Sequence, residues 1–379
     1  MAKPLVLSYW NVNRPVTGGL RRVTALLEAL GPDLILCQPE PAHPRYETVT
    51  YHTNWARTGE GINWGLFNLF LPEPARVARA ALREARPGLV VLTSVWTAWP
   101  VRRTPLPMVL DAHDALGTAI AERYGRLHPF TLLVRRWERR VARRADHIFI
   151  CSSVDRDYFI REYGIAESRL TVVPNGVHVP PRLEDRPASA LPPGWDERLT
   201  GKTVLFFMGK LSYQPNVQGL RFLSDEVLPE LERQRPGRFC VVACGGDALP
   251  GIAHPALHVA GVVSDEDLQA FLRRADLCLS PTFTGSGTRL KILEYLAARK
   301  SVISTPKGAE GLGAVSGRDL IQAEPRDFAP AILSLAADPD RARALGQAGF
   351  DFVRQRYDWS ACIQPLWRRE LNRWLEPPL

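Results

Sequence analysis

The sequence predicts an α/β protein made of two doubly wound, parallel-sheet domains. Segments with strand character alternate with segments of helical period almost throughout its 379 residues. The alternation stops once, at residues 177–200, where five prolines fall in a stretch that shows neither period. With 45% hydrophobic residues, each half is long enough to bury a core of its own.

Composition also limits where the protein can work. The longest apolar runs, such as 89–92 and 204–208, have the length of a strand, well short of the roughly 18 to 20 residues that span a bilayer. The first residues lack the small-residue cleavage site of a signal peptide. Six scattered cysteines without a CxxC pair are typical of buried free thiols. We therefore expect a cytoplasmic protein.

The first half begins with a strand at 4–10 and a helix at 20–30, with Gly18 and Gly19 at the junction between them. In a doubly wound sheet such junctions gather at the carboxyl edge, where ligands bind. A later strand, in PMVLDAHDALG, brings three ionisable side chains to the same edge, Asp111, His113 and Asp114. By itself, a histidine at such an edge is more often a structural group than a catalytic one.

The second half repeats the alternation. Its first strand, KTVLFFMGK, ends at Gly209 and Lys210, and a helix follows from near Pro215. Further strands are expected at 239–243, 257–260 and 277–280. The last of these leads directly into the most informative stretch of the chain.

That stretch, SPTFTGSGTRLKILEYLAA, has the pattern of a strand, a tight loop and a helix. Gly285 and Gly287 flank Ser286 directly before the helix, so backbone N–H groups at the helix start can face an anion. Arg289 and Lys291 follow in the first turn, where cations oppose the helix dipole unless something negative is bound nearby. The pattern predicts a phosphorylated ligand here.

Glu294 lies on the same apolar helix and must have a partner. One interpretation is an ion pair with Lys291, three residues earlier, with glycines that only form a tight turn. The other is a hydrogen bond to the bound ligand. The spacing alone allows both.

The run GSGTRLKILEYLAARKSVISTPKGAEGL resembles the donor-binding signature of the family 4 ("group 1") retaining glycosyltransferases, which have the GT-B fold. The resemblance implies that Glu294 binds the ribose hydroxyls of a nucleotide-sugar. Family members often carry a second Glu where this chain has Ser286, a departure that bears on recognition of the donor sugar. The loop and helix start would hold the diphosphate and sugar through Ser286, Gly287, Thr288, Arg289, Leu290 and Lys291.

The resemblance extends to the first half of the chain. Family members have an Asp-x-His at the place of Asp111 to His113, and its histidine reaches the donor sugar. They also have a glycine-rich loop after the first strand, near the donor phosphates, which corresponds to Gly18 and Gly19.

A further correspondence concerns the first strand of the second half. Family members have a Gly-Arg or Gly-Lys at the position of Gly209 and Lys210, whose cation binds the diphosphate, often with a second Lys about six residues on. This chain has Asn216 there, so we expect Lys291 or Arg289 to supply the second charge.

The resemblance implies two domains that face a cleft. Residues 1–176 would form the acceptor-side domain, 177–200 the linker, and 201–356 the nucleotide-sugar-binding domain. Residues 357–379 would form a final helix that packs back on the first domain. The expected reaction is transfer of a sugar, with retention, to a glycan, lipid-linked or small-molecule acceptor.

Catalysis is expected to be electrostatic. No side chain stands out as a nucleophile, which suits a front-face mechanism in which the departing diphosphate takes the acceptor proton. Its charge would be stabilised by cations and by amides near Gly287. The expected catalytic residues are His113, Lys210 and Glu294.

We expect no metal and no other cofactor. Two pairs of aspartates have DxD spacing, but each pair lies at an expected helix start, where capping explains it. These pairs are Asp155 with Asp157 and Asp265 with Asp267.

Two features of the first half leave alternatives open. The net charge of +8 is concentrated there, with 23 Lys and Arg against 16 Asp and Glu in residues 1–180. Much of it lies in 135–144, a helix with Leu133, Trp137 and Val141 on one side, which is either solvated or contacts an anionic membrane or a pyrophosphate-linked acceptor. The aromatic segment 54–71 either packs on the core or forms an acceptor-binding or lipid-touching surface.

Trp96 and Trp99, at the carboxyl end of the strand at 89–93, could stack on a sugar or pack in the core. Nucleic acid is not expected as a partner, because no binding signature accompanies the charge. The rival functions are a sugar-nucleotide epimerase on the same fold and a non-catalytic nucleotide-sugar-binding protein.

Overall fold

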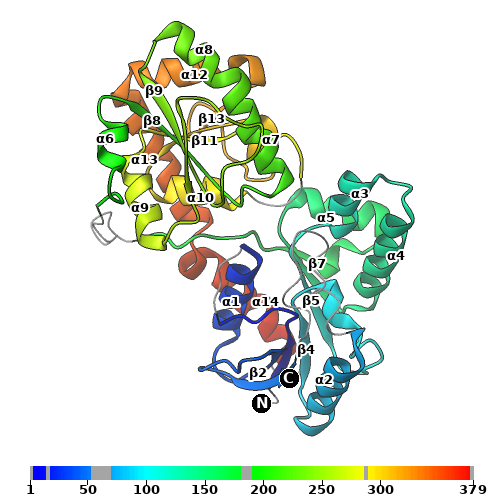
Figure 1. Cartoon of the computed structure of the whole chain (residues 1–379). Coiled ribbons are helices and arrows are strands. Elements are labelled where there is room, and N and C mark those ends of the chain that lie inside the picture. Colours follow the sequence, from blue (N-terminus) through cyan, green and yellow to red (C-terminus); the bar gives the residue numbers. More distant parts are fainter. Residues whose placement is uncertain (1–2, 14–17, 53–69, 181–189, 286–288, 376–379) are drawn as a thin grey trace. The chain divides into compact units, whose positions relative to one another are not determined.

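The computed structural model describes residues 3–13, 18–52, 70–180, 190–285 and 289–375. The chain divides into two compact units (Figure 1). Unit 1 consists of residues 1–175 and 359–379, and unit 2 consists of residues 176–358. Among the described residues, no helix is long and apolar enough to cross a bilayer.

Unit 1 is built on a parallel sheet of seven strands in the order β3-β2-β1-β4-β5-β6-β7. The central strand β1 pairs with β2 through Leu5 and Ile35 and with β4 through Leu5 and Val90. The strands are β1 (Pro4–Leu7), β2 (Ile35–Pro39), β3 (Glu47–Tyr51), β4 (Leu89–Leu92), β5 (Met108–Ala112), β6 (His147–Ile150) and β7 (Leu170–Val172). The helices are α1 (Gly18–Leu30), α2 (Pro72–Glu84), η2 (Val95–Ala98), α3 (Leu116–Tyr124), α4 (Pro129–Arg144), α5 (Ser153–Tyr163), η3 (Glu167–Arg169), η6 (Trp359–Ile363) and α14 (Gln364–Leu375).

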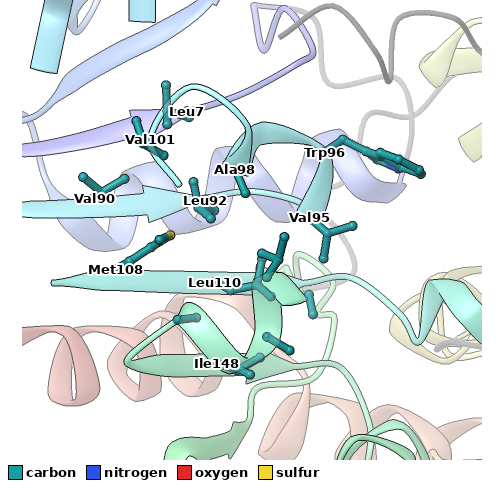
Figure 2. Packing of buried hydrophobic residues seen from close by; sticks show 14 of the residues in the cluster. Leu7, Val90, Leu92, Val95, Trp96, Ala98, Val101, Met108, Leu110 and Ile148 are labelled. Carbon is teal, nitrogen blue, oxygen red and sulfur yellow. The ribbon is translucent and has the colours of Figure 1, made fainter. Parts of the chain in front are cut away.

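Alternate residues of each central strand enter the core on opposite faces of this sheet, as the two-residue period of a strand requires. One face packs against α2, α4 and α5 and contains Leu7, Leu92 and Leu110, with the η2 turn folded over it (Figure 2). The other face contains Val6 and Val91 and packs against α1 and α14. Burial on both faces explains the continuous apolar strands that the sequence shows.

Unit 2 repeats this plan with a parallel sheet of six strands in the order β10-β9-β8-β11-β12-β13. The strands are β8 (Thr203–Met208), β9 (Phe239–Cys244), β10 (Leu257–Gly261), β11 (Leu277–Ser280), β12 (Ser301–Ser304) and β13 (Ile321–Gln322). The helices are α6 (Trp195–Leu199), α7 (Gln214–Phe222), η5 (Leu223–Val227), α8 (Leu228–Gln234), α9 (Asp265–Arg274), α10 (Leu290–Ala297), α11 (Pro306–Ala309), α12 (Pro325–Ala337) and α13 (Pro339–Arg356). One face packs on α9, α10 and α13, and the other on α7, α8 and α12.

Two parallel, doubly wound sheets confirm the predicted fold class. In each sheet the strand order reverses once, between β1 and β4 in unit 1 and between β8 and β11 in unit 2. The loops that leave the carboxyl ends of these strands diverge to opposite faces, which opens a crevice at the sheet edge. These two places are therefore where a ligand is expected.

Several local predictions were wrong. The first strand ends at Leu7, because the Ser8 hydroxyl and Trp10 exchange hydrogen bonds in a turn. The segment 177–200 contains the helix α6, whose Leu199 enters the core of unit 2. On α4 the residue that packs inward is Val134, while Leu133 is 63% exposed.

Of the two tryptophans that follow β4, Trp96 belongs to the core of unit 1, and Trp99 is partly exposed beside it. Trp96 is 5% exposed, and Trp99 stacks on Phe70 with ring centroids 5.3 Å apart. Of the aromatic segment 54–71, residues 54–69 lie outside the described part of the chain.

The C-terminal helix α14 should contribute strongly to the stability of unit 1. Trp367 is fully buried, stacks on Trp359 with a centroid distance of 6.0 Å, and carries the Arg22 guanidinium 4.9 Å above its ring. We expect Trp367→Ala to lower the free energy of unfolding by about 3 to 5 kcal/mol. The partly exposed Trp374 of the same helix is the control, and its alanine variant should lose much less. Equal losses in urea denaturation would contradict this assignment.

Candidate functional site

The strand-order reversal of unit 2 gathers cationic and amide side chains. Gly209 and Lys210 directly follow β8, and the loop after β11 leads into α10. The Asn216 side chain, 8% exposed on α7, donates from Nδ2 to the backbone oxygen of Lys210 at 2.9 Å. Its Oδ1 accepts a hydrogen bond from Lys291 Nζ at 2.7 Å. One amide therefore joins the loop after β8 to the start of α10.

This arrangement requires a glycine at position 209. Its φ angle is 144°, and a Cβ atom there would lie 2.7 Å from Asn216 Nδ2. Any larger residue would displace the amide that holds Lys210 and Lys291 together. The Lys210 side chain itself is exposed.

Lys291 has an unusual environment for an ammonium group. Its Nζ lies 4.2 Å from the centroid of the Phe207 ring, and its neighbour Arg289 has the same charge. Burial, with a smaller contribution from Arg289, lowers the pKa of Lys291 to about 7. A negative group bound beside Lys291 would raise this pKa again.

The start of α10 is held by two further contacts. Arg289 occupies the N-cap position, so the helix begins at Leu290, and its guanidinium donates to the backbone oxygens of Thr284 and Gly285 at 3.2 and 2.6 Å. The Tyr295 hydroxyl, fully buried, accepts the Met208 N–H at 2.8 Å and ties α10 to the end of β8.

Glu294 is partly exposed on α10, between buried residues. Of the other residues predicted for this site, Ser286, Gly287 and Thr288 lie outside the described part of the chain. The structure therefore brings Gly209, Lys210, Arg289, Leu290, Lys291 and Glu294 to one edge of the sheet of unit 2.

Unit 1 has its own cluster, centred on a buried ion pair. Arg22 and Asp111 are both fully buried, and the guanidinium contacts the carboxylate through three hydrogen bonds of 2.6 to 3.0 Å. Arg22 also donates to the Val173 backbone oxygen at 2.8 Å and to Asn175 Oδ1 at 3.2 Å. Burial alone would raise the pKa of Asp111, but the charges and hydrogen bonds of Arg22 and His113 together lower it.

His113 lies beside this pair. Its Nε2 is 3.4 Å from Asp111 Oδ2 and shielded from solvent, and its ring lies 5.7 Å from that of Trp10. A Cβ atom on Gly19 would lie 2.8 Å from Trp10 and 3.2 Å from His113 Nδ1. Gly19 thus lets the start of α1 approach the histidine, and the structure brings Gly18, Gly19 and His113 together within unit 1.

Two buried carboxylates hold the loop that carries His113. Asp155 accepts the Ala115 N–H at 3.2 Å, and Glu138 accepts the N–H groups of Leu116 and Gly117 at 2.9 and 2.8 Å. The Tyr163 hydroxyl donates to Glu138 at 2.6 Å. These bonds satisfy the free donors at the start of α3, as capping groups do.

Burial dominates the proton affinities in this cluster. It raises the pKa of Glu138 to about 7, although hydrogen bonds from Tyr163 and Gly117 oppose the shift. It also raises the pKa of Asp114 to about 6, with a contribution from the charge of Asp155. The edge of unit 1 therefore holds carboxyl groups that titrate close to neutral pH.

Both DxD pairs lie at helix starts. The N-caps are Ser152 and Ser264, whose hydroxyls accept the N–H groups of Asp155 and Asp267 at 3.1 Å each. The described residues contain no group of three or more His, Cys, Asp or Glu side chains that could hold a metal ion.

The sequence interpretation missed Arg22 and Glu138. The signal was present, because each is a charge on the inward side of a helix, and that criterion singled out Glu294. Arg22 lies on α1 with the buried Leu26 and Ala29, and Glu138 lies on α4 between Val134 and Val141. The arginines around Glu138 obscured the apolar side of this helix, so its inward position was not recognised.

Two family models match the chain. The model described as "Glycosyltransferase Family 4" matches residues 16–179, and the one described as "Glycosyl transferases group 1" matches residues 202–338. A D-inositol 3-phosphate glycosyltransferase of Corynebacterium kroppenstedtii is 24% identical over 250 residues, which cover 60% of this chain and 54% of the relative. The chain thus spans about half the length of the curated relatives that it matches.

Solved structures share the fold over nearly the whole chain. Sucrose-phosphate synthase from Thermosynechococcus elongatus superposes with a TM-score of 0.72 at 17% identity, covering 98% of this chain and 99% of its own. The Anabaena protein HepE, in complex with UDP-glucose, has a TM-score of 0.70 at 14% identity and covers 98% of this chain and 100% of its own. At such identities the likeness is one of fold.

The role of Glu138 can be tested directly. Glu138→Gln keeps the size of the side chain but turns an amide N–H₂ toward donors, so we expect a loss of about 1 to 3 kcal/mol in the free energy of unfolding. Hydrogen exchange at the amides of Leu116 and Gly117 should accelerate. Glu162→Gln, a half-exposed carboxylate on α5, is the control and should change neither. Unaltered exchange in the Glu138 variant would show that the loop does not depend on this carboxylate.

Proposed function

Because the chain belongs to the family 4 (group 1) glycosyltransferases and has their GT-B fold, we propose that it transfers a sugar from a nucleotide-sugar to an acceptor with retention of configuration. The observation that carries the proposal is the pair of lysines joined by Asn216 where the strand order of unit 2 reverses. The proposed acceptor is a glycan, a lipid-linked molecule or a small molecule, as the sequence predicts.

The diphosphate of the donor would lie between Lys210 and the start of α10. The site provides the Lys210 ammonium and the first N–H groups of the helix, which favour a bound anion. Lys291 supplies the second charge that Asn216 cannot, and Asn216 holds the Lys291 ammonium where it can also approach the diphosphate. The low pKa of Lys291 supports this role, since an ammonium group in this environment gains from a negative partner.

Glu294 would bind the ribose hydroxyls one turn further along α10. A carboxylate can accept hydrogen bonds from both vicinal hydroxyls, and each bond to a charged group is worth about 1.5 to 3 kcal/mol. HepE was solved with UDP-glucose, so UDP-glucose is the first donor to test.

Unit 1 would supply the acceptor side and His113. We assign His113 to the donor sugar, held by the loop that Asp155 and Glu138 fix. In the transfer, the bond from the anomeric carbon to the diphosphate oxygen breaks and a bond to the acceptor oxygen forms on the same face. The acceptor proton passes to the departing diphosphate, whose charge Lys210 and Lys291 stabilise.

We further propose a cytoplasmic location for this reaction. All six cysteines are free thiols, and five of them are buried. Burial raises the pKa of Cys37, Cys244 and Cys278 to about 12, so these thiols are unreactive. A reducing compartment fits this use of cysteine.

The deciding experiment is incubation with UDP-, GDP-, dTDP- and ADP-sugars, with and without a panel of acceptors. Transfer to an acceptor with the anomeric configuration retained in the product, read by NMR, supports the proposal. Conversion of a nucleotide-sugar without acceptor would instead identify an epimerase. Nucleotide binding without transfer to any acceptor would favour a non-catalytic binding protein, the alternative that Ser286 keeps open.

Glu294→Gln should weaken the binding of the preferred nucleoside diphosphate by about 1.5 to 3 kcal/mol, roughly 10- to 150-fold, because a neutral amide loses the charge-assisted bonds to the ribose. Glu226→Gln, an exposed carboxylate on η5 of the same unit and outside the run that resembles the donor-binding signature, is the control. Calorimetric titration of both variants measures the difference. Unchanged affinity in a folded Glu294 variant would remove this residue from the site.

Binding of the diphosphate should be accompanied by proton uptake. Since the pKa of Lys291 is lowered to about 7, the amine is mostly neutral at pH 8 in the free protein, and a bound diphosphate raises the pKa so that a proton is taken from the buffer. Calorimetry with UDP in buffers of different ionisation enthalpy measures this proton. Lys291→Met should lose the uptake and much of the affinity.

The control for this experiment is Lys300→Met. Lys300 also has a lowered pKa, mainly through burial, but its amine donates to the backbone oxygens of Arg273 and Ala275. The Lys300 variant should keep the proton uptake. A buffer-independent enthalpy in the wild-type protein would place the diphosphate away from Lys291.

A further inference from the structure

The helix α4 presents an unusual excess of positive charge. Six arginines lie within residues 135–144, and the one acidic residue among them, Glu138, points inward and is fully buried. Arg136, Arg139 and Arg140 are exposed, and none of them forms an ion pair with another described residue. Arg135 and Arg144, at the two ends of this stretch, pair with Glu162 and Asp146, so the outer face of α4 is basic without ion-pair partners only at its centre.

The arginines line two hollows. One, of about 570 Å³, lies between α4 and α5 and is lined mainly by arginines, together with Leu132, Glu162 and Tyr163. The other, of about 270 Å³, shares Arg140 and adds Arg102 and Arg103. Burial, together with the charges of Arg103, Arg79 and Arg140, lowers the pKa of Arg102.

Exposed leucines accompany this charge. Leu127, in the turn before α4, is 86% exposed, and Leu132 and Leu133, near the start of the helix, are 50% and 63% exposed. Among the described residues, every other leucine side chain is buried or only partly exposed. Single exposed leucines are ordinary, but three beside a row of arginines form a surface that is both apolar and basic.

We propose that α4 and the turn before it dock on the surface of an anionic lipid bilayer. Leu127, Leu132 and Leu133 would enter the headgroup boundary, while the arginines contact phosphate groups. A soluble polyanion would bind the arginines, but it would not contact the exposed leucines. It would also not require the arginines of both hollows that meet at Arg140. The proposal does not depend on the transfer reaction, because it concerns a surface that α4 presents away from His113.

The test is co-sedimentation of the full chain with vesicles of phosphatidylcholine alone and of phosphatidylcholine mixed with phosphatidylglycerol. The wild-type protein should bind only the mixed vesicles, and added salt should weaken the binding. Arg136→Ser/Arg139→Ser/Arg140→Ser should bind roughly a hundredfold more weakly, since each basic residue near the surface contributes about fivefold.

Two matched variants separate the explanations. Arg326→Ser/Arg343→Ser/Arg354→Ser removes the same charge from exposed arginines of unit 2 and should bind as the wild type does. Leu132→Ser/Leu133→Ser leaves the charge unchanged, and both side chains are exposed, so this variant should fold normally yet bind several-fold more weakly.

Three results would overturn the proposal. The first is failure of the wild-type protein to bind anionic vesicles. The second is full binding by the leucine variant, which would reduce the surface to one that attracts any polyanion. The third is an increase in melting temperature with inorganic pyrophosphate or an RNA oligonucleotide, lost in an Arg139→Ser variant, together with no binding to vesicles.

Discussion

Parallel pairing of the strands is the constraint on which the rest of this structure depends. Because the described strands of each sheet run in one direction, every loop that follows a strand emerges at the same edge. Gly209 and the start of α10 are separated by about eighty residues in sequence, yet they meet because β8 and β11 are neighbours. The same rule brings Gly19 and His113 together in unit 1. In each unit the candidate site residues gather at one edge of the sheet because the parallel topology brings the loops after the strands to that edge.

The two edges handle buried charge in opposite ways. In unit 1 the cation of Arg22 is matched by Asp111, and the pair is surrounded by further hydrogen-bond acceptors, so it is complete within the protein. Among the described residues of unit 2, the direct contacts of Lys291 are with neutral groups, the amide of Asn216 and the ring of Phe207. A complete pair holds a loop in position, whereas an incomplete one favours a ligand of opposite charge.

Much of this could be predicted from the sequence, and the failures have physical reasons. Apolar strands and glycine-rich junctions depend on neighbouring residues, so the fold class and the α10 region were predictable. Arg22, Glu138 and Asn216 each depend on a partner distant in sequence, namely Asp111, Leu116 and Lys291, and spacing along the chain carries no record of such pairs. The inward turn of Val134 rather than Leu133 shows the same limit, because a helix with arginines on most positions has no clear apolar stripe.

One helix links the two properties of unit 1. The inner side of α4 supplies Glu138, which fixes the loop after His113, and its outer side supplies the arginines and leucines. These sides cannot vary independently, because a shift of α4 by one residue would put Trp137 or Arg139 in the place of Glu138 and leave the N–H groups of Leu116 and Gly117 without their acceptor. The register of α4 is therefore fixed by the loop. That constraint also fixes which arginines and leucines face outward, so the surface charge of this helix is set by the requirements of the interior.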